Sequence, residues 1–206
     1  AWIRDNLAPS VPVEVTPDLV CGLSLPAVER PAGPPILGVT VRQRQEQDDF
    51  GRVRALCERA AGMGFRVRRI VLATGLTRAA DLQAFAGLGL DDTELVSTDD
   101  LSAISRAIGE CTITASMKFH GVVVATMYGV PTLAMMPTHK TKSFLTTLGR
   151  ADLLTNFNDP DLPDRFDPGL RPIDPSGPAA LRREAAAHLA GLRQRILEVT
   201  APGYPA

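Results

Sequence analysis

Two short segments of the chain gather side chains that can bind or protonate an anion. The first contains Lys118 and His120 and continues into Gly121, and the second, residues 138–142, reads THKTK and contains Lys140. Lysine offers a positive charge, histidine titrates near neutral pH, and glycine lets the backbone approach a ligand closely. These residue types favour a phosphate or carboxylate ligand, although they do not specify one reaction.

The chain around these segments alternates between strand and helix patterns. Strand patterns recur at 36–41, 67–73, 94–97, 112–116 and 131–136, and helical patterns at 50–64, 78–87, 101–108, 119–128 and 142–148. Thr77 is placed to cap the second helix, and Asp99 or Asp100 to cap the third. Such regular alternation implies an α/β protein with a parallel sheet covered on both faces. Right-handed crossovers then make it a Rossmann-like, doubly wound fold.

The predicted sheet brings the cationic segments to a single edge. Ligands of open parallel sheets bind beyond the carboxyl ends of the strands, next to helix N-termini with free N–H groups. Arg42 ends the first strand, Lys118 and His120 follow the fourth, and Lys140 follows the fifth. We therefore expect an anion pocket at this edge, where Arg42 can hold a carboxylate or phosphate through two parallel hydrogen bonds.

Each of these residues also has a simpler interpretation. Arg42 could pair with Asp48 or Asp49, loop lysines are usually solvated, and a histidine at a helix start is often a cap or a surface residue. The convergence of three cationic loops on one edge, in a chain whose net charge is only −1, favours the anion site.

The two ends of the chain differ from the alternating centre. Residues 1–35 are rich in proline and are predicted to form an inter-domain segment or linker. Residues 36–156 form the predicted Rossmann-like domain. Residues 157–206 are predicted to be an irregular connection followed by an amphipathic helix at 179–199, and the part up to 178, rich in Asp and Pro, is expected to run over the surface.

Composition and known motifs exclude several classes of function. The 22 basic and 23 acidic residues give no reason to expect nucleic acid as a partner. Cys21, Cys57 and Cys111 form no CxxC pair, which argues against a disulfide scaffold and a structural zinc site, and the last two fit buried positions. GxGxxG, GxxxxGK[ST], GxSxG and HExxH motifs are all absent. No metal and no cofactor are expected.

Signals for export or membrane insertion are also missing from the sequence. The first residues show no secretory signal, and no apolar run approaches the length of about 20 residues that spans a bilayer. We therefore expect a cytoplasmic protein without a transmembrane segment.

The sequence around His120 resembles the signature of polysaccharide pyruvyl transferases. Residues 116–125 read SMKFHGVVVA, and residues 128–132 read YGVPT. In that family a strand ends in a basic residue, an aromatic or aliphatic residue and His, and a helix and a Gly-x-Pro turn follow. The resemblance runs from about residue 2 to residue 156. Other residues that fit it are Arg4, Asp5, Thr16, Pro17, Asp18, Arg42, Lys140, Phe144, Leu148 and Gly149.

The resemblance implies a fold and an activity. Members have a two-domain GT-B-like fold with the active site in the cleft, and this chain is similar to the C-terminal, donor-binding half. An N-terminal domain is therefore expected to be missing. Members transfer a pyruvyl group from phosphoenolpyruvate onto two hydroxyls of a sugar, which forms a pyruvate ketal in cell-envelope polysaccharide biosynthesis. The expected partners are phosphoenolpyruvate and a sugar or lipid-linked glycan acceptor.

The resemblance also implies roles for individual residues. His120 would be the catalytic acid and base, while Arg42, Lys118, Phe119 and Lys140 would bind the substrate. A histidine suits this role because it can deliver a proton to the methylene carbon of the donor and later take one up. Many members carry Arg in place of Lys118, and lysine does not reproduce the two-pronged carboxylate contact of arginine.

Two other functions fit the same residues. A glycosyltransferase or sugar-nucleotide enzyme of the GT-B type would use the same anion pocket for a diphosphate. A non-catalytic binding module would keep the fold without the reaction. Ligand-induced stabilisation by phosphoenolpyruvate or by nucleotide sugars separates the three, because a bound ligand raises the apparent stability.

Overall fold

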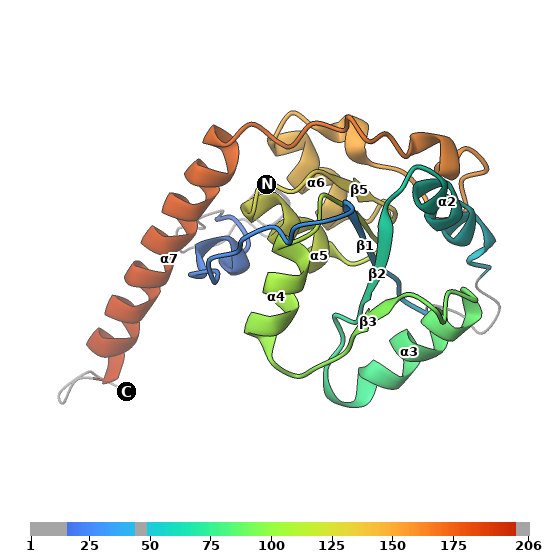
Figure 1. Ribbon diagram of the computed structural model, residues 1–206. Helices are drawn as coiled ribbons and strands as arrows, with labels where there is room; N and C mark the ends of the chain where they lie inside the picture. The colour runs from blue at the N-terminus through green and yellow to red at the C-terminus, as the bar shows by residue number, and fades with distance from the viewer. Residues whose placement is uncertain (1–15, 44–48, 201–206) are drawn as a thin grey trace. The chain divides into compact units, whose positions relative to one another are not determined.

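The computed structural model describes residues 16–43 and 49–200 of the 206-residue chain (Figure 1). The described residues divide into two compact units. The larger unit is Ser24–Pro178, and the smaller one is formed by the described residues that precede Ser24 and follow Pro178. Arg4 and Asp5, which contribute to the family resemblance, lie outside the described residues.

A five-stranded parallel sheet forms the centre of the larger unit (Figure 1). Its strand order is β3-β2-β1-β4-β5, so β1 lies in the middle, between β2 and β4. All five residues of β1 are buried, as expected for a strand covered on both faces. The strands are β1 (Ile36–Thr40), β2 (Arg66–Ile70), β3 (Glu94–Val96), β4 (Ile113–Ser116) and β5 (Thr132–Ala134).

Helices follow the strands and cover both faces of the sheet. They are α2 (Gly51–Gly62) after β1, α3 (Arg78–Gly87) after β2, α4 (Leu101–Gly109) after β3, α5 (Phe119–Met127) after β4 and α6 (His139–Thr147) after β5. The chain moves in one direction along the sheet from β1 to β3 and in the other from β3 to β5. Right-handed crossovers therefore place α2 and α3 on one face and α4 and α5 on the other.

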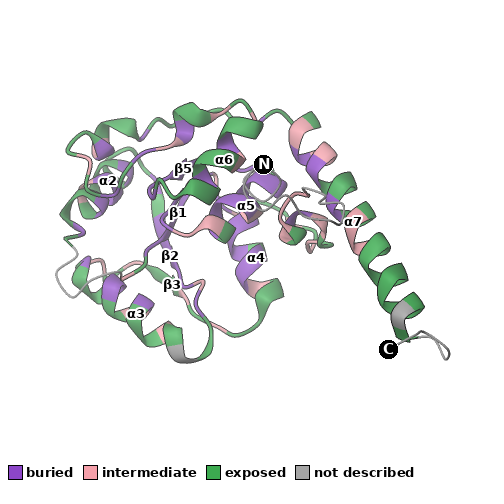
Figure 2. Cartoon of the chain, turned by 180° about the vertical axis from the view of Figure 1, so that it is seen from behind, coloured by how far each residue is buried: buried purple, intermediate pink, exposed green. Residues whose placement is uncertain are grey.

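Two separate hydrophobic clusters agree with this arrangement. One contains Leu56 of α2 and Phe85 of α3, and the other contains Ile104 of α4 and Ala125 of α5. Figure 2 shows the buried residues on the strands and on the inner sides of these helices. The Rossmann-like, doubly wound fold expected from the sequence is confirmed.

The starts of two helices show how local chemistry sets their limits. Asp100 caps α4, because its carboxylate accepts a hydrogen bond of 2.8 Å from the amide of Ser102. Thr77 stands at the start of α3 but does not cap it, and its hydroxyl donates to the carbonyl of Thr74. The short helix η2 (Gly75–Thr77) runs directly into α3, so the first amide of α3 already bonds to the carbonyl of Gly75.

The segment that follows β5 and α6 is mostly exposed, as expected of a surface connection, but it also contributes side chains to the core. It is irregular apart from η3 (Ala151–Leu153) and η4 (Leu162–Arg165), but Phe157, Leu162 and Phe166 are buried in the same cluster as α2. The rings of Phe157 and Phe50 lie 5.9 Å apart, and those of Phe166 and Phe65 lie 5.1 Å apart in a T-shaped pair. The sequence did not predict these buried contacts, because the apolar residues are irregularly spaced among Asp and Pro and produce no periodic signal.

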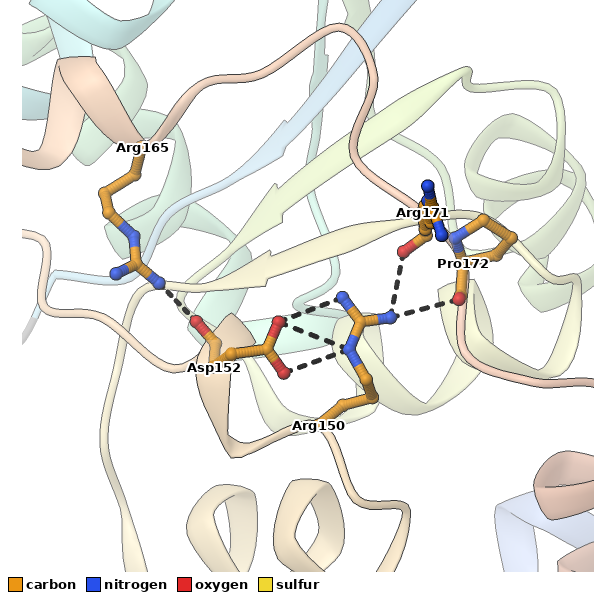
Figure 3. Close-up of polar contacts among 5 residues, drawn as sticks. All are labelled: Arg150, Asp152, Arg165, Arg171 and Pro172. Atoms are coloured by element: carbon orange, nitrogen blue, oxygen red, sulfur yellow. Dashed lines mark hydrogen bonds and ion pairs between the residues drawn. The ribbon is translucent and has the colours of Figure 1, made fainter.

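Two arginines, Arg150 and Arg165, join residues 157–178, which we call the return segment, to η3 and the residue before it (Figure 3). The Nη1 of Arg150 donates to the carbonyls of Arg171 and Pro172, both at 3.0 Å, and its Nε donates to Asp152 at 2.9 Å. Arg165 donates to the carbonyl of Asp152. The hydrogen bonds from Arg150 hold the pKa of the Asp152 carboxyl below its usual value.

The segment before β1 also belongs to the larger unit. Tyr128 donates its hydroxyl proton to the carbonyl of Pro26 at 2.9 Å, and Gly109 lies so close to Val28 that an added Cβ would be 2.7 Å from its Cγ2. Within the stretch expected as a linker, Pro26 and Val28 therefore contact the end of α5 and α4.

The smaller unit contains η1 (Leu19–Gly22) and, from Ala179 onward, the helix α7 (Ser176–Thr200). This confirms the helix expected at 179–199. Gly22 packs closely on Ala185 of α7, where an added Cβ would lie 3.1 Å from the Ala185 Cβ. The later part of α7 exposes Leu192 and Ile196. In the part of the chain that the structure describes, no helix has the length and apolar character needed to cross a bilayer.

The cysteines occupy the positions expected of small apolar residues. Cys21, Cys57 and Cys111 are free and buried. Burial raises the pKa of the Cys57 and Cys111 thiols to about 12 and that of Cys21 to about 11. The three thiols are therefore protonated at neutral pH, and a thiol in that state is a poor nucleophile.

Candidate functional site

The strand order reverses between β1 and β4, and this is the point where open α/β sheets bind ligands. The two strands end side by side, with Thr40 in register with Ser116 and their hydroxyl oxygens 2.6 Å apart. The amide of Met117 donates to the carbonyl of Thr40 at 3.0 Å. We call residues 41–43 beyond β1 and residues 117–121 beyond β4 the switch-point edge.

The turn from β4 into α5 is held by Ser116. Its hydroxyl donates to the carbonyl of Lys118 at 2.8 Å and accepts from the amide of Lys118 at 3.1 Å. Gly121 lies directly against this turn, because a Cβ there would overlap the Ser116 hydroxyl and approach Leu72 Cδ1 to 2.9 Å. The first turn of α5 therefore packs tightly against the end of β4.

The N-terminus of α5 differs from that of α6 in how its amides are satisfied. Lys118 occupies the cap position of α5 in an extended conformation, and its side chain makes no capping hydrogen bond. In α6 the Thr138 hydroxyl accepts a bond of 3.2 Å from the amide of Thr141 and also contacts the Thr141 hydroxyl at 2.8 Å. Of these two helix starts, that of α5 is the better anion site.

Lys118 is paired with a residue that the sequence reasoning missed. Its ammonium Nζ lies 2.5 Å from the Oδ2 of Asp81, in the first turn of α3. The Asp81 side chain is 3% exposed and that of Lys118 is 18% exposed. Only one feature of the sequence indicated this role, namely that Asp81 is an acidic residue after the second strand, on the same sheet edge. The role of Lys118 as an anion ligand stays a prediction, and the structure adds that its charge has a buried counterion.

Phe119 and His120 begin α5, as the sequence predicted. His120 is exposed, and its ring centroid lies 5.6 Å from that of Phe119. Phe119 is half-buried and makes a T-shaped contact with Phe144 of α6 at 5.7 Å. These ring contacts connect the start of α5 to α6, and the histidine lies at the surface of the switch-point edge.

The two remaining predicted residues are exposed at the carboxyl ends of other strands. Arg42 lies two residues beyond β1, on the switch-point edge itself. Asp49, one of its suggested partners, accepts a bond of 2.8 Å from the amide of Gly51, and the other, Asp48, lies outside the described residues. Lys140 is in the first turn of α6, after the outermost strand β5, and so stands one strand away from the switch point.

The carboxylates after β3 have structural partners. Asp99 forms an ion pair with Arg78 of α3, and Asp100 caps α4. Among residues 16–43 and 49–200, no three His, Cys, Asp or Glu side chains gather in a way that could hold a metal ion.

These features define a Rossmann-like α/β domain with an uncapped helix start beside its switch point. The structure is similar to part of an O-GlcNAc transferase from Thermobaculum terrenum, with a TM-score of 0.50, 18% identity, and coverage of 85% of this chain and 38% of that one. It is also similar to a putative UDP-N-acetylglucosamine 2-epimerase from Listeria monocytogenes, with a TM-score of 0.51, 16% identity, and coverage of 84% and 47%.

These similarities agree with a Rossmann-like α/β fold of the kind found in GT-B-type structures. The chain spans less than half the length of either of these two structures. No family model matches the chain. No curated protein matches it either.

Proposed function

We propose that this chain is the donor-binding part of a GT-B-type transferase or sugar-nucleotide enzyme, and that its donor carries a diphosphate. The observation that carries this proposal is the start of α5, which is uncapped, lies against β4 through Gly121 and stands at the switch point. Amides at such a helix start, together with the helix dipole, bind phosphate oxygens. The names of both similar structures refer to N-acetylglucosamine, and one includes UDP, so UDP-N-acetylglucosamine is the first ligand to test.

Side chains at the same edge support a phosphate ligand. Arg42 is exposed beyond β1 and His120 is exposed in the first turn of α5, on the two sides of the reversal in strand order. Both can donate hydrogen bonds to phosphate oxygens, and such charge-assisted bonds are stronger than neutral ones. The α6 start is a weaker candidate because Thr138 already caps it.

Transfer of a pyruvyl group from phosphoenolpyruvate is the second candidate. The residues that resemble the pyruvyl transferase signature lie at the start of α5, and His120 is exposed there. In this reaction the methylene carbon of the donor takes up a proton and the hydroxyls of a sugar attack the neighbouring carbon, with phosphate as the leaving group. The ion pair between Lys118 and Asp81 weakens this candidate. It neutralises a lysine that was expected to bind phosphoenolpyruvate, which is a small and highly charged donor.

Thermal unfolding of the chain with UDP-N-acetylglucosamine, UDP and phosphoenolpyruvate at one ionic strength tests the proposal. We expect the two uridine ligands to raise the midpoint, since at 100 times its Kd a ligand stabilises by about 2.7 kcal/mol. His120→Ala should reduce this shift, whereas His139→Ala, a matched change at the capped start of α6, should leave it unchanged.

Other outcomes select among the functions. Stabilisation by phosphoenolpyruvate alone supports pyruvyl transfer, and in the full-length protein His120→Ala should then lower ketal formation by about 100-fold while phosphoenolpyruvate still binds. A midpoint that responds to none of the ligands contradicts both enzyme proposals and favours a non-catalytic binding module.

A further inference from the structure

The ion pair between Asp81 and Lys118 crosses the switch point. Asp81 belongs to α3, which follows β2, and Lys118 lies two residues beyond the end of β4. Because β1 lies between β2 and β4, the pair bridges the elements on the two sides of the β1 end. It also joins the two faces of the sheet, since α3 covers one face and α5 the other.

This ion pair is buried more deeply than its neighbour on the same edge. The Asp81 side chain is only 3% exposed, whereas Asp99, which pairs with Arg78, is 67% exposed. Interactions of exposed charges are weakened by water and salt, while a buried carboxylate keeps its effect on the adjacent ammonium. The Asp81 carboxylate therefore cancels the Lys118 charge where the sequence alone placed a free cation.

We infer that Asp81 determines how much negative charge a ligand bound at the switch-point edge can carry. This inference rests on the proposed function, because it concerns the donor that binds beside α5. With Lys118 neutralised, the negative charge of a donor is met by the amides at the start of α5, by Arg42 and by His120. Small, multiply charged anions such as pyrophosphate and phosphoenolpyruvate then bind weakly, and a donor with dispersed charge and hydroxyl groups is favoured.

Asp81→Asn tests this inference because it removes the charge and nearly preserves the shape. The Lys118 ammonium loses its counterion, and an added anion can replace it. We expect inorganic pyrophosphate, measured by isothermal titration at constant ionic strength, to bind Asp81→Asn about tenfold or more tightly than the unchanged chain, as expected for one recovered charge-assisted contact.

Two matched variants locate the effect. Asp99→Asn removes a carboxylate from the same sheet edge and should change pyrophosphate affinity by less than about twofold, because the Asp99 side chain is 67% exposed and its effect on nearby charges is already screened by water and salt. The double change of Asp81→Asn with Lys118→Met should return the affinity to that of the unchanged chain. An Asp81→Asn protein with unchanged or weaker pyrophosphate binding overturns the inference, as does an equal gain in Asp99→Asn.

The folding of the variant provides a second measurement. If Asp81→Asn does not fold in dilute buffer, it should recover its native circular dichroism in pyrophosphate but not in sodium chloride of equal ionic strength. A variant that folds in neither overturns the inference, since Asp81 would then be needed for the fold itself.

Titration of the same proteins with UDP-N-acetylglucosamine separates this inference from the proposed function. If the unchanged chain binds the nucleotide sugar and Asp81→Asn gains no pyrophosphate affinity, the role of Asp81 is wrong and the proposed function stands. If the nucleotide sugar does not bind but Asp81→Asn gains pyrophosphate affinity, the proposed donor is wrong and the role of Asp81 stands.

Discussion

Gly121 carries no side chain because the first turn of α5 lies directly against β4. A Cβ at this position would overlap the Ser116 hydroxyl and lie 2.9 Å from Leu72 Cδ1. The same Ser116 hydroxyl holds the Lys118 backbone and contacts Thr40. At the scale of single residues, the geometry of the candidate site therefore depends on one close contact between a glycine and a serine.

Gly121→Ala should destabilise the protein through this contact. We expect a loss of about 1–3 kcal/mol in the free energy of unfolding, the usual cost of adding a methyl group to a tightly packed interior. Urea unfolding followed by circular dichroism measures it. Gly87→Ala at the end of α3 is the control, since its added Cβ meets nothing within 4 Å and should be neutral or stabilising by up to about 1 kcal/mol. Equal stability of the two variants would contradict the proposed packing of α5.

Arg150 acts at the scale of elements, because it joins η3 to the return segment that follows it (Figure 3). Its guanidinium donates to two backbone carbonyls and to the Asp152 carboxylate at the same time. The fixed fork of the arginine guanidinium can bond to several acceptors at once. Periodicity contains no information about such a bond, because the residues that it joins belong to irregular segments.

Asp152→Asn should change how the stability of the protein depends on pH. The hydrogen bonds from Arg150 lower the folded-state pKa of Asp152 below its unfolded value, so the carboxylate stabilises the fold above the unfolded pKa. This contribution is lost as the pH falls below about 4 and through the folded-state pKa. Since Asp152 is 61% exposed, it should amount to no more than about 1 kcal/mol.

Urea unfolding between pH 6 and about pH 2.5, well below the unfolded pKa of an aspartate, measures this difference. Wild type should be more stable than Asp152→Asn at pH 6, and the two should converge in acid. Arg150→Met should be less stable at every pH, because it also removes the bonds to Arg171 and Pro172. Parallel pH profiles of wild type and Asp152→Asn would rule out the pKa effect.

At the scale of the whole molecule, the larger unit extends beyond the domain predicted at 36–156. It is Ser24–Pro178, and residues on both sides of the predicted domain fill its core and surface. Phe157, Leu162 and Phe166 complete the hydrophobic cluster over α2. The amides of Thr155 and Phe157 also donate to the carbonyls of Ala134, the last residue of the outermost strand β5, and of Met135, which follows it.

A fragment of residues 24–156 should therefore fail to fold, whereas a fragment of residues 24–178 should unfold cooperatively. Removing one buried Phe side chain costs about 3–5 kcal/mol, and the shorter fragment lacks two of them and a leucine, against a typical total stability of about 5–15 kcal/mol. Thermal unfolding followed by circular dichroism compares the two. A cooperative transition of similar midpoint in the shorter fragment would show that the return segment is dispensable.

Local patterns in the sequence determined the strands and helices, and with them the parallel sheet and the edge that carries Arg42, Lys118, Phe119 and His120. Periodicity, caps and turn residues act over a few positions, so these features can be read without knowing which strands are neighbours. The tertiary structure alone decided which residues meet across that edge. Asp81 and Lys118 come together because the strand order places β2 and β4 on the two sides of β1. Phe157, Leu162 and Phe166 of the return segment are buried because they pack in the same cluster as the apolar residues of α2. Both depend on the order of strands and the filling of the core, which are set by contacts between residues far apart in the chain.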